Sequence, residues 1–280
     1  MAISKTPTEV ELVDARQVLQ LHAIAQLRRL LPLYEATHDP QLLDEIQRWT
    51  AMLPEEDGIP MENFWHYLQI GLLIELVNQL WHDRRDYFAA GNVFVYYSPD
   101  QAEDVVLNRS TAYRGPDFFV VTGIDGEKPR DNWVVWLEGK YPDLIIELLS
   151  DTTADNDKNT KKDIYQNIFR TREYFWYDGD TEFAGWELVD GKYQPKTPNE
   201  RGWFWSEVLG AWLGIHRSVY ERRAFNWLRL FDREGRLVPT QEEAKRQAQR
   251  QAEQERLKRE QVEAELERLK ARLRELGVEE

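Results

Sequence analysis

The alternation of apolar and polar positions is most informative between residues 142 and 178. An apolar run at 144–149 lies between a proline and a Ser-Asp pair, and this pattern predicts a buried strand. Successive strand side chains point to opposite faces, so Glu147 shares a face with Ile145. Because burying an isolated carboxylate is costly, Glu147 needs a cationic partner.

The residues that follow predict a helix and then a second strand. Three lysines open the helix: Lys158, Lys161 and Lys162. Its apolar stripe would consist of Ile164, Tyr165, Ile168 and Phe169, and residues 173–177 read as the next strand. A strand, a helix and a strand form a crossover unit, which would bring a lysine close to Glu147.

The N-terminal third predicts three helices. Apolar residues recur at helical spacing over 13–31 and again over 42–52, after a His-Asp-Pro break. A third helix, over 62–83, is apolar almost all round and should pack beneath a sheet. His66 and Glu75 stand out within it, and the simpler interpretation places both at the polar rim, although a functional role stays open.

Further strands are expected at 92–97 and 117–121, with a polar stretch between them and a short strand over 134–137. Asp117 follows a Gly-Pro pair, and Asp143 follows a proline in the same way. Asp117, Asp143 and Glu147 should therefore lie near two adjacent strands, with Lys161 on the following helix. Asp143 precedes Glu147 by four strand residues, a distance of about 13 Å, which indicates a supporting role.

After residue 178 the pattern indicates a hairpin, with strands over 183–189 and around Tyr193 joined by an Asp-Gly turn. Four tryptophans follow. They could stack on nucleic-acid bases, but tryptophan among alternating strand residues usually belongs to the core. The residues concerned are Trp203, Trp205, Trp212 and Trp227.

The tail, over 240–276, differs in composition because it has no glycine or proline and is rich in Glu, Gln, Arg and Ala. Its apolar residues alternate at spacings of four and three, which predicts a coiled coil and favours a homodimer, parallel or antiparallel. A single solvated helix is the alternative. The seam consists of Val262, Leu266, Leu269, Leu273 and Leu276, and towards the N-terminus it weakens through Arg259, Glu255, Ala252 and Ala248.

Length, composition and net charge limit the classes of protein to which this chain can belong. The 280 residues, 42% of them hydrophobic, allow one substantial domain with additions. The absence of cysteine excludes disulfides and thiolate chemistry and fits a reducing interior, and no stretch predicts a membrane span or a signal peptide, so we expect a cytoplasmic protein. The net charge of −14 argues against a broadly basic nucleic-acid surface, but not against a nuclease with a local basic groove and bound metal.

Carboxylates that converge from neighbouring strands are suitable ligands for a hard cation such as Mg²⁺. A metal of this kind activates water and neutralises charge on a phosphodiester, while a nearby lysine stabilises developing negative charge. Asp117, Glu147 and Lys161 are the candidate catalytic residues, and the two acids are the candidate metal ligands. A purely structural Glu-Lys pair is the alternative.

Several sequence blocks together resemble the Uma-type restriction-endonuclease family common in cyanobacteria. These blocks are GPDFFVV, PDLIIELLS, KKDIYQNIFRTREYFWYD and LVDGKY, within a match from about residue 63 to residue 215. The resemblance implies membership of the PD-(D/E)xK superfamily. It also implies a restriction-endonuclease-like mixed sheet flanked by helices, and DNA cleavage that depends on Mg²⁺ or Mn²⁺.

In this resemblance Asp117 falls on the first acid of the family, Glu147 on the second acid, and Lys161 on a lysine carried by the helix. Asp143 occupies the aspartate of the second Pro-Asp pair. Leu149 stands where the superfamily's E-x-K motif has lysine, so Lys161 would have to supply the ammonium group from the helix.

The sequence therefore predicts an α/β protein with three parts: a helical extension over 1–60, a nuclease domain over 61–238 and a coiled coil over 239–280. Two functions are compatible with it. One is a metal-dependent DNA endonuclease that is paired through its coiled coil. The other is a nuclease fold that lacks catalysis and serves as a binding or regulatory protein.

Overall fold

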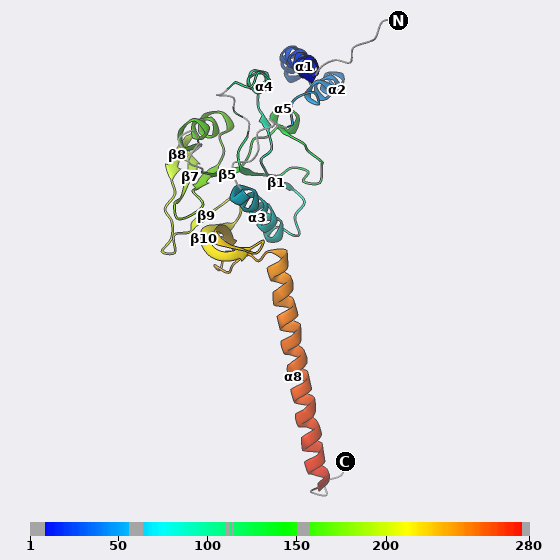
Figure 1. The fold of residues 1–280 in the computed structure, drawn as a ribbon, viewed down its shortest axis with the longest axis vertical. Helices are drawn as coiled ribbons and strands as arrows, with labels where there is room; N and C mark the ends of the chain where they lie inside the picture. Colours follow the sequence, from blue (N-terminus) through cyan, green and yellow to red (C-terminus); the bar gives the residue numbers. More distant parts are fainter. Residues whose placement is uncertain (1–8, 56–63, 110–112, 114, 150–156, 276–280) are drawn as a thin grey trace. The chain divides into compact units, whose positions relative to one another are not determined.

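The structure is a computed structural model that describes residues 9–55, 64–109, 113, 115–149 and 157–275 (Figure 1). The chain divides into two compact units, with the boundary between Leu237 and Val238. The larger unit is built around a mixed β-sheet with helices on both faces, and this confirms the predicted α/β class.

The central sheet has six strands in the order β1-β3-β5-β6-β7-β8. Only β5 and β6 run parallel, and the other neighbouring strands are antiparallel. All five residues of β5 are buried, as expected for a strand in the middle of a sheet covered on both faces. The strands are β1 (Tyr87–Gly91), β3 (Phe118–Thr122), β5 (Leu144–Leu148), β6 (Glu173–Tyr177), β7 (Phe183–Val189) and β8 (Lys192–Pro195).

The parallel pair β5 and β6 is joined by the predicted crossover helix. The helix begins as a π-helical turn, η1 (Asp157–Lys161), continues as α7 (Lys162–Ile164) and ends as a second π-helical turn, η2 (Tyr165–Phe169). Tyr165 and Phe169 are buried against the sheet, whereas Ile168 is 42% exposed, so its predicted place in the apolar stripe is wrong. Arg170, with a φ of 53°, ends the helix in the left-handed conformation.

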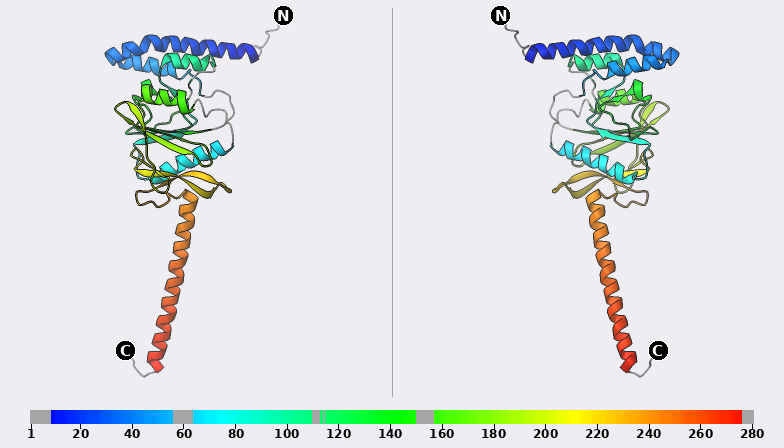
Figure 2. Two further views of the ribbon diagram at one scale, coloured as in Figure 1. Left: turned by 90° about the vertical axis from the view of Figure 1, so that its left-hand side faces the viewer. Right: turned by 90° about the vertical axis from the view of Figure 1, so that its right-hand side faces the viewer.

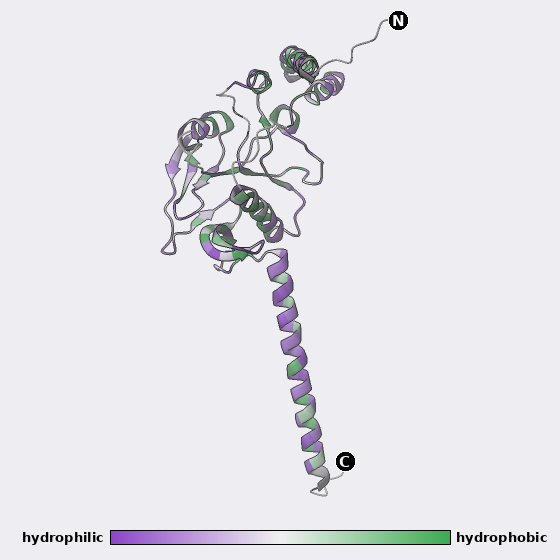
Figure 3. Ribbon diagram, in the orientation of Figure 1, coloured by the Kyte–Doolittle hydropathy of each residue, from purple (hydrophilic) through white to green (hydrophobic). Residues whose placement is uncertain are grey.

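The opposite face of the sheet is covered by α3 (Phe64–Leu80), which packs against β1 and against β11 of a second sheet. Figure 2 shows α3 and the crossover helix on either side of the central sheet, and Figure 3 shows how apolar α3 is. The buried Gln69 of α3 bonds the backbone of Leu228 twice: its amide donates to the carbonyl oxygen at 3.1 Å, and its oxygen accepts from the N–H at 2.9 Å.

The second sheet has three antiparallel strands in the order β11-β10-β9. Sequence periodicity did not predict these strands, although the tryptophans within them were expected in the core. Trp227 is fully buried, whereas the other three tryptophans are only partly buried. The strands are β9 (Phe204–Ser206), β10 (Ala211–Tyr220) and β11 (Arg223–Phe231).

The two N-terminal helices, α1 (Glu9–Thr37) and α2 (Pro40–Thr50), share a hydrophobic core with a helix from later in the chain, α4 (Pro99–Val106). Ser98 begins α4 by accepting a hydrogen bond from the backbone N–H of Gln101. The sequence predicted only a polar stretch at α4, because charged residues separate the few apolar positions that form its buried face.

Two predicted strands need correction. The strand expected over 92–97 shrinks to β2 (Val95–Tyr96), since the chain has already completed β1 at Gly91. The strand expected over 134–137 is mostly helical: β4 (Trp133–Val134) leads into α5 (Val135–Glu138), which ends at Gly139 with a φ of 68°. Apolar runs this short fit either structure, and the left-handed glycine favours a helical turn.

The second unit contains α8 (Gln241–Glu275), which confirms the long helix expected in the tail. Thr240 and Glu243 form a reciprocal capping pair, in which each side chain accepts a hydrogen bond from the backbone N–H of the other. Leu276 lies outside the described residues. Among the helices that the structure describes, none has both the length and the apolar character needed to cross a bilayer.

Candidate active site

The candidate site lies at the end of the central sheet where β5 finishes. Glu147 is fully buried there, on the face of the sheet that carries Ile145 and is covered by the crossover helix. Its strand neighbours are hydrophobic, so its carboxylate depends on polar groups from other elements. Those groups come from the crossover helix and from the residue that precedes β3.

The crossover helix supplies two donors to Glu147. Lys161 Nζ lies 3.1 Å from Oε2 as a partly buried ion pair, and the Tyr165 hydroxyl donates to Oε1. Lys161 and Tyr165 lie one helical turn apart, so they share the face that meets the sheet. The helix is partly π-wound here, a feature that is frequent at functional sites.

Asp117 joins the site from the segment before β3. Since Phe118 pairs with Ile146, Asp117 comes next to Glu147 in the antiparallel register. The Asp117 N–H donates to Glu147 Oε2 at 3.3 Å, while Asp117 Oδ2 accepts from the N–H of Leu148 at 2.7 Å. The structure thus brings together the three side chains that the sequence singled out.

The two tyrosines nearest Glu147, Tyr165 and Tyr113, remain neutral at physiological pH. Burial, and then the negative charge of Glu147, raise the pKa of Tyr165 well above the ordinary value for tyrosine. Burial also raises the pKa of Tyr113, whose ring lies edge-on at 6.0 Å from that of Tyr165. A neutral phenol beside a carboxylate can donate a hydrogen bond without adding negative charge.

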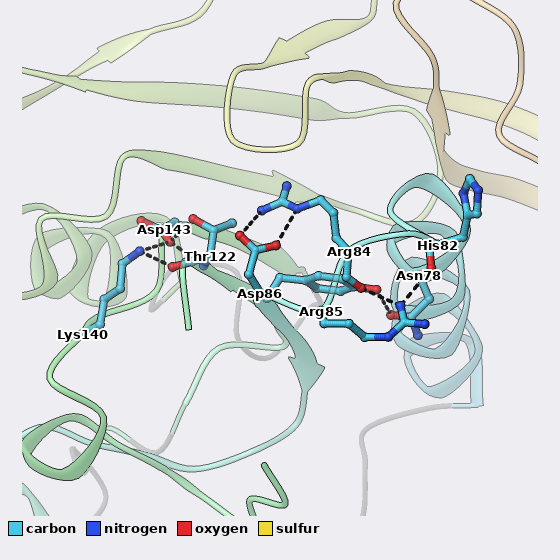
Figure 4. Close-up of polar contacts among 9 residues, drawn as sticks. Asn78, His82, Arg84, Arg85, Asp86, Thr122, Lys140 and Asp143 are labelled. Carbon is cyan, nitrogen blue, oxygen red and sulfur yellow. Dashed lines mark hydrogen bonds and ion pairs between the residues drawn. The ribbon is translucent and has the colours of Figure 1, made fainter. Parts of the chain in front are cut away.

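Asp143 lies at the other end of β5, in a cluster of its own, as its spacing from Glu147 predicted. It accepts hydrogen bonds from the Thr122 N–H at 2.7 Å and from the Thr122 hydroxyl at 2.9 Å, and Lys140 lies 2.9 Å away (Figure 4). Arg172 adds an ion pair at 3.2 Å. Burial favours a raised pKa, but these donors and cations outweigh it and lower the pKa of Asp143.

Among the residues whose side chains the structure describes, the others that the sequence singled out lie outside the candidate site or do not contribute a polar group to it. His66 is 6% exposed, so the expectation that it lies at the polar rim of the helix is wrong; its ring centroid lies 5.1 Å from that of Trp65. Burial first, and then the charge of Glu75, raise the pKa of Tyr220 to about 12. Leu149, which replaces the motif lysine, is buried in the core. Lys158 lies in the first helical turn, and its side chain is outside the described part of the molecule.

The donors at this site are of the type that a hard divalent cation requires. Within the residues described, no group of three or more His, Cys, Asp or Glu side chains could hold a metal ion. Asp117 and Glu147 nevertheless supply two carboxylates at one point, and Asp117 Oδ1 receives no hydrogen bond from the described residues. Because Mg²⁺ is commonly held by one or two carboxylates and waters, the two acids fit such an ion.

Tyr165 is the residue of the site that sequence reasoning missed. Its aromatic ring was assigned to the apolar stripe of the helix, and the ring does pack there, between Tyr113 and Tyr174. Its hydroxyl nevertheless binds Glu147. The available signal was its position one turn after Lys161, which places both side chains over the same strand.

The match to a family model agrees with the motifs. No curated protein matches the chain. A solved structure from Anabaena variabilis, described as a putative nuclease belonging to DUF820, is 14% identical, covers 54% of this chain and 76% of its own, and has a TM-score of 0.38. The family model Uma2, described as "Putative restriction endonuclease", matches residues 57–219. That match covers more than half of the sequence, and the chain therefore belongs to the Uma2 family.

Proposed function

We propose that this protein is a metal-dependent endonuclease that hydrolyses phosphodiester bonds in DNA. The observation that carries the proposal is that Asp117 and Lys161 both meet Glu147: the Asp117 backbone N–H lies 3.3 Å and Lys161 Nζ 3.1 Å from Glu147 Oε2. Two carboxylates and an ammonium group are the components that hydrolysis of a phosphodiester requires. The description of the Uma2 family supports the same reaction class.

In this proposal Asp117 and Glu147 hold Mg²⁺, and Mn²⁺ can replace it because it accepts the same oxygen donors. The ion would activate a water and neutralise phosphate charge. Lys161 presents its ammonium group beside Glu147, where it can orient the scissile phosphate or the attacking water. Tyr165 fixes the rotamer of Glu147 through its hydrogen bond.

Cleavage of supercoiled plasmid DNA in the presence of Mg²⁺ or Mn²⁺ tests the proposal. Wild-type protein should nick or linearise the plasmid, and Glu147→Ala should abolish cleavage. The control is Glu200→Ala, purified in parallel, because Glu200 is an exposed acid in a turn. Equal activity in wild type and Glu147→Ala would identify a contaminating nuclease, and an inert wild type with both metals would reject catalysis.

A non-catalytic nuclease fold is the second candidate function, and one observation favours it. The oxygens of Glu147 already accept hydrogen bonds from Lys161, Tyr165 and the Asp117 N–H, so the carboxylate is satisfied within the protein itself. Such a protein would act through binding, with α8 as its contact to a partner. Tight binding of DNA or of a protein without any cleavage would support this function.

We also propose that α8 pairs with the α8 of a second copy. Its apolar seam is exposed: Val262 by 65%, Leu266 by 49% and Leu269 by 54%. The sequence continues the same spacing through Leu273 and Leu276. In heptad terms Leu266 and Leu273 are a positions, while Val262, Leu269 and Leu276 are d positions, so a partner helix would cover a continuous stripe.

The charges that flank this seam are complementary in a parallel pair in register. In that arrangement Lys258 at g faces Glu263 at e of the partner, and Glu265 faces Lys270. Within the described helix Lys258, Glu263 and Glu265 make no ion pair, whereas Lys270 contacts Glu267 at 3.0 Å. An antiparallel pair would place g opposite g and e opposite e, which can also bring Lys258 opposite Glu265 and Glu263 opposite Lys270.

A further inference from the structure

The hairpin formed by β10 and β11 reaches the same end of the central sheet as the candidate active site. Tyr177, the last residue of β6, donates its hydroxyl to the carbonyl oxygen of Asn226. The Asn226 amide donates to Asp180 Oδ1 at 2.9 Å, in the loop that follows β6. Since Tyr177 pairs with Leu148, the hairpin is attached beside the residue that follows Glu147, on the face of the sheet opposite to the Glu147 side chain.

The tip of this hairpin extends past its point of attachment. Strand pairing continues from Asn226 opposite Arg217 to Arg223 opposite Tyr220. Three residues of strand correspond to about 10 Å. Glu221 and Arg222, with φ values of 47° and 64°, form the tight turn. Figure 2 shows the hairpin, in gold, projecting near the start of α3.

The tip is positively charged although the whole chain carries a net charge of −14. Arg217, Arg222 and Arg223 are exposed, and none of them forms an ion pair with an acid in the described ranges. Arg223 instead places its guanidinium 4.5 Å from the ring of Phe64. An acidic protein that acts on a polyanion needs local cations of this kind near its active site.

Apolar side chains lie among these arginines. Val219 is 63% exposed, Phe225 is 41% exposed and Phe64, beneath Arg223, is 55% exposed. Arginines placed between exposed apolar side chains suit the surface of a nucleic acid, where guanidinium groups bind phosphates and apolar groups contact sugars or bases. A neutral or basic partner would leave the three guanidinium charges uncompensated.

We propose that the tip of the β10–β11 hairpin binds the phosphate backbone of duplex DNA and positions it at the site of Asp117 and Glu147. This inference rests on the proposed nuclease function and adds the surface that recruits the substrate. Phosphate contacts of this type set orientation and affinity without reading sequence.

The test measures DNA binding by fluorescence anisotropy, with full-length protein carrying Glu147→Gln so that the labelled duplex stays intact. The hairpin variant adds Arg217→Glu, Arg222→Glu and Arg223→Glu. The control adds Arg246→Glu, Arg250→Glu and Arg268→Glu on α8, which changes net charge by the same amount. A second hairpin variant, Arg217→Gln alone, guards against misfolding, and circular dichroism monitors all four proteins.

We expect the hairpin variant to lose at least ~10-fold in affinity, and the slope of log K against log salt to become shallower by about 2 to 3. Arg217→Gln should lose affinity in the same direction, and the α8 control should change less than about twofold. Equal losses in the hairpin and α8 variants would overturn the hairpin assignment, as would a Glu147→Gln parent protein that does not bind the duplex. Binding that depends on the hairpin without any cleavage would support this inference and reject only the nuclease activity.

Discussion

Lys161 Nζ contacts Glu147 Oε2 at 3.1 Å, across a sequence separation of 14 residues. The contact exists because the crossover helix returns over the strand that it has just left, as right-handed crossover units do. A buried carboxylate and the cation that neutralises it thus come from the first strand and the helix of one crossover unit. Lys161 on the helix therefore supplies the ammonium group that Leu149, at the lysine position of the superfamily motif, does not.

Replacement of Lys161 by methionine should reduce plasmid cleavage at least ~100-fold, the usual effect of removing one charge-stabilising group from an active site. The variant should also unfold about 3 kcal/mol more easily, because Glu147 stays buried without its cation. Initial cleavage rates and urea denaturation measure the two effects.

The matched control for this change is Lys162→Met. Lys162 is the next residue, and its ammonium group lies 3.7 Å from the centre of the Trp186 ring. It should keep activity close to that of wild type. Similar losses of activity in both variants would show that Lys161 acts only through the helix and has no role at the site.

Tyr165→Phe should leave the fold intact and weaken the response to metal. Without the hydroxyl the Glu147 carboxylate can rotate, so the Mg²⁺ concentration that gives half-maximal cleavage should rise several-fold, at a stability cost of about 1 to 2 kcal/mol. Tyr193→Phe is the control, since that hydroxyl donates to the Thr171 carbonyl oxygen at 3.0 Å, away from Glu147. An identical metal response in both variants would argue against a positioning role for Tyr165.

Asp143 should make folding stability depend on pH. Its pKa is lowered in the folded protein, so its contribution is fully present above the unfolded pKa of about 3.9 and is lost as pH falls through the folded value. Asp143→Asn should therefore reduce the free energy of unfolding at pH 7 and lessen its decline below about pH 4. Urea denaturation at several pH values measures both, and parallel curves for the two proteins would contradict the assignment.

Parallel pairing of α8 predicts a specific cross-link. The chain has no cysteine, so Leu269→Cys introduces one thiol, which would meet its counterpart across the axis of an in-register parallel dimer. Mild oxidation should give a disulfide dimer on a non-reducing gel, whereas Ala271→Cys on the outer face should not.

Analytical ultracentrifugation of the protein without introduced cysteines measures its molecular mass in solution and so tests whether it forms dimers. A monomer at all concentrations would contradict pairing. Cross-linking between Leu269→Cys and Leu273→Cys chains, without cross-linking of Leu269→Cys alone, would indicate the antiparallel arrangement instead.

Much of the site could be predicted because it lies within one crossover. The apolar strand around Glu147 and the helical spacing around Lys161 are local patterns, and the handedness of the crossover brings them together. The position of Asp117 could be predicted because this residue directly precedes β3, the strand that pairs with β5. Tyr165 could not be assigned from periodicity, because a tyrosine can bury its ring and present a hydroxyl from the same position.

Other parts of the fold could not be predicted from the sequence, because contacts between residues far apart in the chain determine them. The strands β10 and β11 carry three arginines and an asparagine, which mask their alternation, and β11 is buried against α3. The helical turn α5 was read as a strand because four apolar or aromatic residues fit either conformation. In both cases the tertiary environment outweighed local propensity.

The two hydrogen bonds between the Gln69 side chain and the backbone of Leu228 have a consequence for how this chain associates with others. Strand β11 is the last strand of its sheet, and its outward N–H and C=O groups at Leu228 are occupied by a side-chain amide, which imitates a neighbouring strand. An unoccupied edge at this position could template pairing with another chain. Gln69 therefore occupies, from within the same chain, the backbone groups of β11 that a strand of another chain would otherwise pair with.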